Sequence, residues 1–442
     1  MKSKQATLFD GIQERKNGNA NRLDPEDRRF HDWYRFVLSF PPHLVRDYME
    51  AFGVDEQSVV LDPFCGTGTT LVESKLRGTE SLGVEANLFA QFASSVKVAW
   101  EVDPDCLWRE SKEIAEAASK ALQKQGIDDQ IPFEGDLNDL HLRELSDEED
   151  GLILANSISP LPLHKTLLLL EHLKQRQNEG TYHHQLLALA KVLVFSISNL
   201  HFGPEVGIGK PKTDAPVVAA WLLEMERIVN DLRTVAGRPH AKAQAHFADA
   251  RRIDEVLAHN SVDAVITSPP YPNEKDYTRT TRLESVVLGF IGSKLELRLL
   301  KKSLLRSNTR NVYKGDDDDK WIEEHPEIQR IADAIEKRRI DMGKTSGFEK
   351  LYGKVTKLYF GGMARHLAAL RPVLRPNAHL AYVVGDQASY LRVMIRTGQL
   401  LGDIAEALGY QVVRIDLFRT RLATATKEQL REEVLVLRYK GR

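Results

Sequence analysis

The sequence of 442 residues predicts an α/β protein with an open, doubly wound and mostly parallel sheet of seven strands. Two observations predict this fold class. From residue 58 onward, short apolar and β-rich runs alternate with helical patterns, which is typical of a parallel sheet buried on both faces. A glycine-rich turn follows the first apolar run, at the point where doubly wound sheets form their ligand crevice.

The predicted strands are short runs rich in aliphatic and β-branched residues: 58–62, 81–86, 243–249, 262–268, 379–386, 410–418 and 432–439. Helical patterns separate most of them, most clearly in residues 68–77, 354–371 and 392–408. A shorter link joins the last two strands. We therefore expect the final strand to be antiparallel.

Two long stretches interrupt this alternation. Residues 101–242 are mostly helical in pattern, and residues 272–350 are rich in charge and also predicted to be helical. We interpret both as insertions at the edge of one domain, formed by residues 27–100 and 243–442. A polar, flexible lead-in, residues 1–26, is predicted before it.

Composition narrows the class of protein without identifying a ligand. The net charge of −2 gives no global sign of a nucleic-acid binder, although a local basic face would be sufficient. Two cysteines are too few for a disulfide scaffold and suit a reducing compartment. The N-terminus lacks the apolar core of a signal peptide, and the most apolar run, 186–198, is too short to span a bilayer. We therefore expect a soluble, cytoplasmic protein with no membrane partner, and we predict no metal site.

The stretch DPFCGTGTT, residues 62–70, connects the first strand to a helix. Gly66 and Gly68 allow positive φ and a close approach of a ligand to the backbone. The helix that begins at Thr69 and Thr70 directs free N–H groups toward the same point. The stretch matches neither Walker A nor the GxGxxG dinucleotide fingerprint. It therefore predicts a ligand site of another kind.

Two further features lie at the ends of predicted strands. Glu85 ends the second strand 17 residues after Gly68, where an acid binds ribose hydroxyls in doubly wound folds. The fourth strand ends in TSPPY, residues 267–271, where two prolines cannot donate to a sheet ladder. Nothing in folding requires this stiff, polar and aromatic corner, so we expect it to have a functional role.

These motifs resemble those of the amino-methyltransferases that act on DNA with S-adenosyl-L-methionine (AdoMet) as cofactor. DPFCGTGTT is similar to their motif I, GVEAN to motif II, FADARRI (247–253) to motif III and TSPPY to catalytic motif IV. HDWYRFVLSFPPHLV (31–45) is similar to motif X, which closes over the methionine end of the cofactor. The resemblance covers roughly residues 30–92, 243–275 and 354–440. It implies the Rossmann-like fold of class I methyltransferases.

The resemblance also implies roles for individual residues. The cofactor-binding candidates come from the motifs similar to X, I, II and III: Phe40, Asp62, Pro63, Phe64, Gly66, Gly68, Thr69, Thr70, Glu85 and Asp249. Among them, Asp249 would meet the adenine amino group of AdoMet. The catalytic candidates are Ser268, Pro269, Pro270 and Tyr271.

The chemistry of this corner suits methyl transfer to an exocyclic amine. The lone pair of such an amine is conjugated into the base, and hydrogen bonds from both amine hydrogens to fixed acceptors would free it for attack. The Ser268 hydroxyl and the carbonyl of Ser268 or Pro269 can supply these acceptors, and Tyr271 offers a face for stacking on a flipped base. Methylation at cytosine C5 needs a placed cysteine nucleophile. It is disfavoured because neither Cys65 nor Cys106 belongs to a loop at the end of the fourth strand.

Serine at the head of the SPPY motif resembles the N4-cytosine subgroup of the family. We therefore predict a site-specific DNA methyltransferase that acts on N4 of cytosine by base flipping. Three alternatives stay open: N6 of adenine in DNA, a base amine in RNA, and a non-catalytic DNA-binding subunit that retains AdoMet. The intact SPPY corner argues against the last. DNA is the expected partner, and a cognate restriction or phage-defence protein is a further candidate.

Target recognition is expected in the insertions, because Asp249 and Ser268 are only 19 residues apart. In the first insertion, the Gly/Pro/Lys-rich loop 199–218 is the best candidate for contacting DNA. In the second, the segment 293–314 carries basic candidates for phosphate contacts: Lys294, Arg298, Lys301, Lys302, Arg306 and Arg310. An ordinary solvated helix face is the alternative. The acidic run 316–319 that follows indicates an exposed loop.

Overall fold

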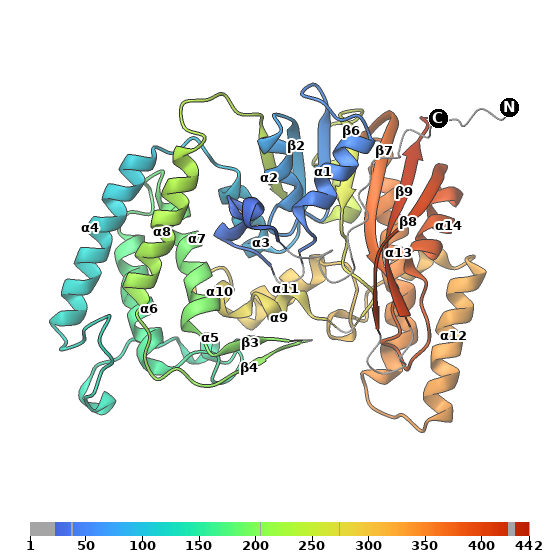
Figure 1. Ribbon diagram of the computed structural model, residues 1–442. Coiled ribbons are helices and arrows are strands. Elements are labelled where there is room, and N and C mark those ends of the chain that lie inside the picture. Colours follow the sequence, from blue (N-terminus) through green and yellow to red (C-terminus); the bar gives the residue numbers. More distant parts are fainter. Residues whose placement is uncertain (1–22, 37–38, 204, 274, 423–428, 442) are drawn as a thin grey trace.

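A seven-stranded sheet forms the centre of the molecule (Figure 1). The computed structural model describes residues 23–36, 39–203, 205–273, 275–422 and 429–441. The strands of the sheet are β1 (Val59–Asp62), β2 (Glu80–Glu85), β5 (Ala243–Phe247), β6 (Val262–Thr267), β7 (Leu374–Gly385), β8 (Tyr410–Leu422) and β9 (Gln429–Tyr439). Their order is β5-β2-β1-β6-β7-β9-β8. Neighbours from β5 to β7 are parallel, whereas β9 is antiparallel to both β7 and β8. The predicted mostly parallel sheet and its antiparallel final strand are confirmed.

Both faces of the sheet are buried, which explains the near-continuous apolar runs of its strands. The side chains of Val60 on β1 and Ile266 on β6 pack with α1 (Pro42–Ala51). The alternate residues Leu61 and Val265 belong to the cluster formed with α13 (Tyr352–Leu370) and α14 (Thr397–Ala407). The helices that follow the first two strands are α2 (Thr69–Leu76) and α3 (Leu88–Lys97).

The first insertion is a group of helices beside α3 (Figure 1). Its helices are α4 (Pro104–Gln123), α5 (Asp147–Asp150), α6 (Pro160–Lys174), α7 (Tyr182–Val192) and α8 (Val217–Arg233). A single apolar cluster runs from Phe89 on α3 to Leu187 on α7 and Trp221 on α8, so the insertion shares its core with the sheet side of the molecule. The stretch 199–218, predicted to be a loop, contains the antiparallel strands β3 (Leu200–Phe202) and β4 (Val206–Ile208).

The second insertion crosses from the helical group to the α13 side of the sheet (Figure 1). It contains α9 (Tyr277–Thr280), α10 (Arg282–Val287), α11 (Lys294–Ser303) and α12 (Pro326–Asp341). Leu283 and Val287 on α10 join the apolar cluster of the first insertion, whereas Ile328 and Ile335 on α12 join the cluster around α13. The segment between α11 and α12 therefore passes the carboxyl ends of the central strands.

A lead-in is predicted for residues 1–26. Of these, residues 1–22 lie outside the described residues. Beyond it, Pro25–Arg28 already form a 3-10 helix, and Asp27 is paired with Arg46 on α1 at 2.8 Å. The boundary of the lead-in at residue 26 is therefore corrected, because ordered structure begins earlier. None of the described helices combines the length and apolarity that a membrane crossing requires.

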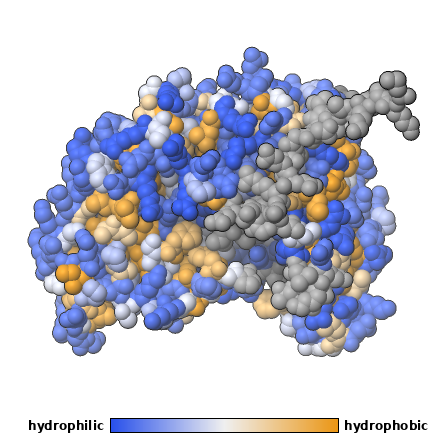
Figure 2. Space-filling model, in the orientation of Figure 1, coloured by the Kyte–Doolittle hydropathy of each residue, from blue (hydrophilic) through white to orange (hydrophobic). Residues whose placement is uncertain are grey.

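The face seen in Figure 1 is mostly hydrophilic (Figure 2). Its lower edge is indented between the side that carries α6–α8 and the side that carries α12. The strands of the hairpin β3–β4 and the helix α11 lie toward this lower edge (Figure 1). Both insertions thus border the indentation.

Candidate active site

A cavity of about 590 Å³ lies where the central parallel strands end. Its walls include the residues that directly follow β1, β2, β5 and β6. The chain order reverses between β1 and β6, and the crevice at such a reversal is the usual ligand site of doubly wound sheets. The cavity is therefore the one that the glycine turn and the TSPPY corner predict.

Most of the predicted site residues line this cavity. They are Phe40, Pro63, Phe64, Gly66, Thr69, Glu85 and Asp249 among the cofactor candidates, and Ser268, Pro269, Pro270 and Tyr271 among the catalytic candidates. Segments that are far apart in the sequence are thereby brought to one place. The role of each residue stays a prediction.

The glycine turn forms one wall of the cavity. Gly66 and Gly68 have φ of +50° and +82°, the left-handed region that favours glycine. The Cys65 N–H donates to the Val84 carbonyl at 3.0 Å and ties the turn to β2. A Cβ on Gly68 would lie 2.6 Å from Oγ of Ser94 on α3. The left-handed φ and the packing against α3 therefore both favour glycine at position 68.

Three cofactor candidates lie behind this wall instead of on it: Asp62, Gly68 and Thr70. The Asp62 carboxylate accepts hydrogen bonds from the Thr267 hydroxyl at 2.6 Å and from the Phe64 N–H at 3.1 Å. The Thr70 hydroxyl donates to the Ile266 carbonyl at 3.1 Å. Asp62 and Thr70 are fully buried, and their bonds join the ends of β1 and β6. These bonds give Asp62 and Thr70 a supporting position, and the contact of the three residues with a cofactor stays a prediction.

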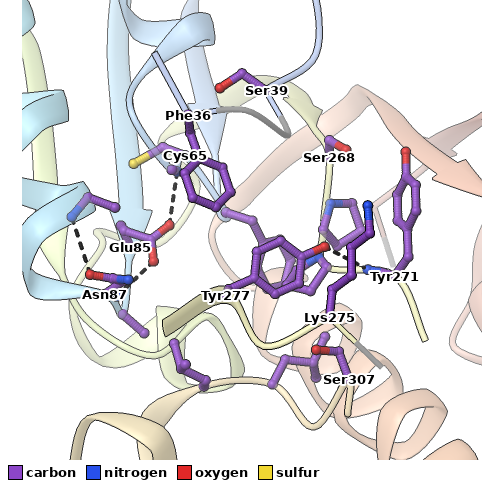
Figure 3. Close-up of a pocket in the computed structure, with 18 of the residues that line it drawn as sticks. Phe36, Ser39, Cys65, Glu85, Asn87, Ser268, Tyr271, Lys275, Tyr277 and Ser307 are labelled. Carbon is purple, nitrogen blue, oxygen red and sulfur yellow. Dashed lines mark hydrogen bonds between the residues drawn. The ribbon is translucent and has the colours of Figure 1, made fainter. Parts of the chain in front are cut away.

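Glu85 lines the cavity at the end of β2, and its carboxylate is held by the backbone (Figure 3). One oxygen accepts from the Gly66 N–H at 2.9 Å and the other from the Asn87 N–H at 2.7 Å. Burial raises the pKa of Glu85 to about 7, and these two hydrogen bonds oppose the shift. The carboxylate is thus oriented beside the turn, and its remaining lone pairs can accept from ligand hydroxyls.

Ser268 begins the corner after β6, and its hydroxyl hydrogen is already used. The hydroxyl donates to the Val383 carbonyl on β7 at 3.2 Å. The oxygen lone pairs therefore remain as acceptors on the cavity side. Pro269 and Pro270 follow and also line the cavity, which keeps this acceptor on a stiff backbone.

Tyr271 lines the cavity with its ring against β7 (Figure 3). A Cβ on Gly385 would lie 3.1 Å from Cε2 of Tyr271, so the ring packs closely against the backbone of this glycine. Burial, and then the nearby Glu432, raise the pKa of the Tyr271 phenol. Its N–H donates to the Tyr277 hydroxyl at 3.4 Å.

Tyr277 and Phe36 are site residues that the sequence analysis missed. Both line the cavity, and their rings are stacked with centroids 6.1 Å apart and an interplanar angle of 27°. Phe36 lies inside the stretch similar to motif X, and Tyr277 lies six residues after Tyr271. The sequence feature that could have identified both residues is an aromatic side chain close to a recognised motif.

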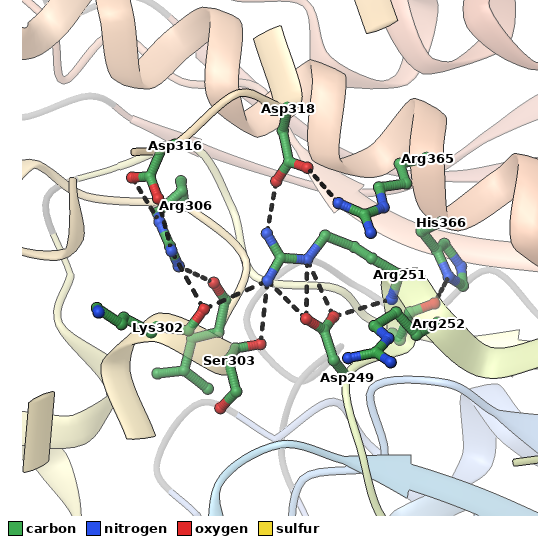
Figure 4. Close-up of polar contacts among 12 residues, drawn as sticks. Asp249, Arg251, Arg252, Lys302, Ser303, Arg306, Asp316, Asp318, Arg365 and His366 are labelled. Carbon is green, nitrogen blue, oxygen red and sulfur yellow. Dashed lines mark hydrogen bonds and ion pairs between the residues drawn. The ribbon is translucent and has the colours of Figure 1, made fainter. Parts of the chain in front are cut away.

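Asp249 also lines the cavity, but its carboxylate is engaged by Arg251 (Figure 4). The guanidinium of Arg251 contacts Asp249 at 2.6 Å and Asp318 at 2.5 Å. It also donates to the carbonyls of Lys302 and Ser303, each at 3.4 Å. Asp249 therefore meets an arginine from its own turn as well as the cavity, an arrangement that the sequence did not predict.

We call residues 303–318 the roof segment, because several of them close the cavity opposite the turn. These residues are Ser303, Leu304, Leu305, Ser307 and Asn311. The segment is held by Asp318, which is 4% exposed and contacts both Arg251 and Arg365. Asp316, in turn, pairs with Arg306 at 2.8 Å. The acidic run predicted to be an exposed loop is therefore corrected, since two of its four residues are internal ion-pair partners.

The basic candidates for phosphate contacts divide into two groups. Arg306 is buried at 3% exposure, and Lys301 is paired with the buried Asp276 at 2.9 Å, so neither presents a free charge at the surface. The predicted phosphate contact is corrected for these two, because their charges are used inside the protein. The remaining four are exposed: Lys294, Arg298, Lys302 and Arg310.

Two distant parts of the chain reach the cavity, where the sequence analysis did not place them. Glu205, in the turn between β3 and β4, brings the first insertion to the cavity wall. Strand β8 contributes Arg419 and Arg421, which pair with Glu432 of β9 at 2.6 and 3.4 Å. The predicted strand 410–418 ends before both arginines, whereas β8 continues to Leu422.

Comparisons with known proteins show which sequences this chain resembles. A family model described as DNA methylase matches residues 9–93. The Type II methyltransferase M.BsoBI of Geobacillus stearothermophilus is 26% identical over 427 residues, which cover 91% of this chain and 83% of that protein. The Type II methyltransferase M.AvaI is 24% identical over 444 residues in both Nostoc sp. strain PCC 7120 and Anabaena variabilis. These matches cover 95% of this chain and 87% of each relative.

Proposed function

Because the chain belongs to the amino-methyltransferase family of the N4/N6 type, we propose that it is a site-specific DNA methyltransferase. Its proposed target is N4 of a cytosine that is flipped out of the duplex. AdoMet is the cofactor that the family implies, and when bound it supplies an electrophilic methyl group on a sulfonium sulfur.

The residues on the β1–β2 side of the cavity fit this cofactor. The Glu85 carboxylate is held at the end of β2 with lone pairs left for the ribose hydroxyls. Phe64, Val84 and Leu305 give an apolar lining for the adenine ring. Asp249 would share its oxygens between Arg251 and the adenine amino group, since a carboxylate offers about four lone-pair sites.

The observation that carries the proposal is the direction of the Ser268 hydrogen bond. Its hydroxyl donates to Val383, so its oxygen presents only acceptor lone pairs to the cavity. An exocyclic amine has two hydrogens, and the Ser268 oxygen and the carbonyl of Ser268 or Pro269 would accept them. Both bonds favour an amine whose lone pair is free to attack a methyl group. Positioning and fixed dipoles supply the catalysis, and no covalent intermediate is needed.

Aromatic groups beside this corner would hold the flipped base. Tyr271, Tyr277 and Phe36 line the same cavity, and base–aromatic stacking is sequence-tolerant and worth about 1–3 kcal/mol per base. The choice of cytosine N4 over adenine N6 rests on the serine that heads the SPPY motif. A role in restriction–modification rests on the Type II names of the relatives.

The test is methyl transfer from labelled AdoMet to duplex DNA, to RNA and to no acceptor. We expect transfer to duplex DNA alone. Sequencing of genomic DNA from expressing cells, with detection that separates N4-methylcytosine from N6-methyladenine, would report the base and the recognised site. Methyl groups in RNA only, or in no acceptor, would contradict the proposal.

The variant Ser268→Ala tests the corner directly. We expect kcat to fall by roughly 10²–10³-fold, the cost of one preorganised polar group, with little change in AdoMet affinity. Ser261→Ala is the matched control, because Ser261 lies just before the other end of β6 and its hydroxyl also donates to a carbonyl, that of Ala258 at 2.6 Å. The control should keep wild-type turnover. An equal loss of turnover and AdoMet affinity in Ser268→Ala would count against the assigned role.

A further inference from the structure

Among the described residues, one cationic side chain of the cavity is not committed to a partner. The basic residues of this part of the chain that line the cavity are Arg251, Lys275, Arg419 and Arg421. Arg251 is paired with Asp249 and Asp318, and both Arg419 and Arg421 are paired with Glu432. Within the part of the chain that the structure describes, the Lys275 ammonium has no ion pair or hydrogen bond. Its charge is therefore available to a ligand.

The backbone of Lys275 is fixed from both sides. Its N–H donates to Oδ1 of Asn273 at 3.0 Å, and its carbonyl accepts from Nδ2 of Asn308 at 3.1 Å. Asn308 is fully buried in the roof segment. The side chain extends from this point toward the corner formed by Ser268 and Tyr271 (Figure 3). Lys275 thus joins the roof segment to the catalytic corner at a defined position.

The surroundings make this lysine costly to hold without a ligand. Burial lowers the pKa of Lys275, and the neighbouring Arg421 lowers it further, while Glu432 and Glu205 oppose the shift. Lysines suited to phosphate contacts lie elsewhere, since Lys294 and Lys302 are exposed on α11. A half-buried ammonium beside the corner is better placed for an acceptor that enters the cavity than for one on its rim.

We propose that Lys275 is a specificity-determining residue that donates a hydrogen bond to the carbonyl O2 of the flipped cytosine. The proposal rests on the proposed function. With the amine held at Ser268, the pairing edge of cytosine continues with a ring nitrogen and then the O2 carbonyl. The same edge of adenine continues with a ring nitrogen and then a C–H group. A donor beyond the ring nitrogen finds an acceptor only in cytosine.

Discrimination follows from the cost of an unpaired donor. When adenine occupies the corner, the Lys275 ammonium would lose water without gaining an acceptor, which costs more than the bond itself contributes. A site built to bond a group on its substrate rejects an analogue that lacks the group. We expect Lys275 to contribute about 10–100-fold of selectivity, as one hydrogen bond from a charged donor does. Lys275 would thereby favour N4 of cytosine over N6 of adenine.

The test compares two substrates and two proteins, all with the full chain. One duplex carries the recognised site with its natural cytosine. The other replaces that cytosine with a 2-aminopyridine C-nucleoside, which keeps the amine and the ring nitrogen but lacks O2. Lys275→Met should lower kcat/KM on cytosine by about 10–100-fold and leave kcat/KM on the analogue within about threefold. An unchanged AdoMet dissociation constant for Lys275→Met would show that the variant is folded.

A matched lysine variant gives the control. Lys302→Met removes an exposed cation of α11, so it should lower kcat/KM on both duplexes by the same factor. An equal loss on both duplexes for Lys275→Met would overturn the O2 contact and indicate a phosphate contact instead. Wild-type transfer to adenine in place of cytosine would also overturn it, while DNA methylation itself would stand. No transfer by the wild type to any DNA would instead overturn the proposed function.

Discussion

The turn side of the cavity and the roof segment face each other but are held by different interactions. The turn side, residues 62–70 with the end of β2, is shaped by backbone hydrogen bonds and glycine conformations. The roof segment is attached by charged side chains, and the contact between Arg251 and Asp318 joins residues 67 positions apart. One wall is therefore specified locally, and the other depends on distant segments meeting.

The difference lies in what each wall loses when one residue changes. A backbone bond on the turn side survives most substitutions, provided that the unusual φ angles remain accessible. A buried charge of the roof segment loses its compensation as soon as its partner is removed. We therefore expect the roof segment to be the more sensitive wall to charge substitutions, and the turn side to be sensitive at its glycines.

The largest expected effect is that of Arg251→Met. The substitution leaves the buried Asp318 without its closest cation and removes a partner of Asp249. Removing one partner of a buried ion pair costs about 3–5 kcal/mol. Urea denaturation would measure the loss in the free energy of unfolding, and hydrogen exchange in residues 303–318 would locate it.

The neighbouring arginine is a matched control for this experiment. Arg252 is paired with Glu255 at 2.6 Å, but both side chains are more than half exposed. An exposed pair is worth about 0–1 kcal/mol, so Arg252→Met should be nearly neutral. Equal losses for the two variants would mean that ion pairs do not hold the roof segment, and the contrast between the walls would fail.

The second expected effect concerns the turn side. Gly68→Ala places a Cβ 2.6 Å from Ser94 Oγ at a φ of +82°. The left-handed conformation costs about 1–2 kcal/mol and the overpacking about 1–3 kcal/mol, so we expect a total loss of roughly 2–5 kcal/mol. Gly66→Ala has positive φ but no atom within 4 Å of its Cβ, and should lose only about 1–2 kcal/mol.

A second substitution at Ser94 separates the cost of overpacking from the cost of the left-handed backbone conformation. Adding Ser94→Ala to Gly68→Ala removes the nearest atom, so part of the stability should return in urea denaturation. If Gly66→Ala and Gly68→Ala lose the same free energy, backbone conformation alone explains the requirement for glycine. The packing of the turn against α3 would then be irrelevant to it.

The turn side could be predicted from the sequence because its signals are contiguous. The alternation of Val60 and Leu61, the paired glycines and the acid at Glu85 each follow from neighbours within one strand–turn–helix unit. The position of Ser268 follows from a strand that ends at two prolines. Of these residues, Gly66, Glu85 and Ser268 line the cavity, where the doubly wound fold brings together the carboxyl ends of its strands.

The roof segment could not be predicted, because charge in a sequence indicates solvent unless a partner is known. Arg306 and Asp316 are ten residues apart and look like members of an exposed charged stretch, yet they form an internal pair. The hairpin β3–β4 was missed since strands of three residues are too short to show alternation. The sequence did not assign a role to the stretch that contains Lys275. This lysine differs from the other described cations of the cavity because they form ion pairs and it does not.

The smallest expected effect is a pH dependence from the turn side. Asp62 is fully buried and forms no ion pair within the described parts of the chain, unlike the carboxylates of the roof segment. Burial raises its pKa from the ordinary 3.8 to about 6, although hydrogen bonds from the Thr267 hydroxyl and the Phe64 N–H oppose the shift. The folded state therefore holds this proton more tightly than the unfolded state does.

The sign of the effect follows from that difference in proton affinity. The contribution of Asp62 to stability is fully present below pH about 4 and is lost as pH rises to about 6. It is lost because the Asp62 carboxyl ionises at a lower pH in the unfolded chain than in the folded protein. Asp62→Asn removes this titration, so the difference in unfolding free energy between variant and wild type should change by on the order of 1–3 kcal/mol between pH 4 and pH 7. Denaturation at the two pH values would measure it. A constant difference would mean that Asp62 titrates alike in both states, and its burial on the turn side would then not make stability depend on pH.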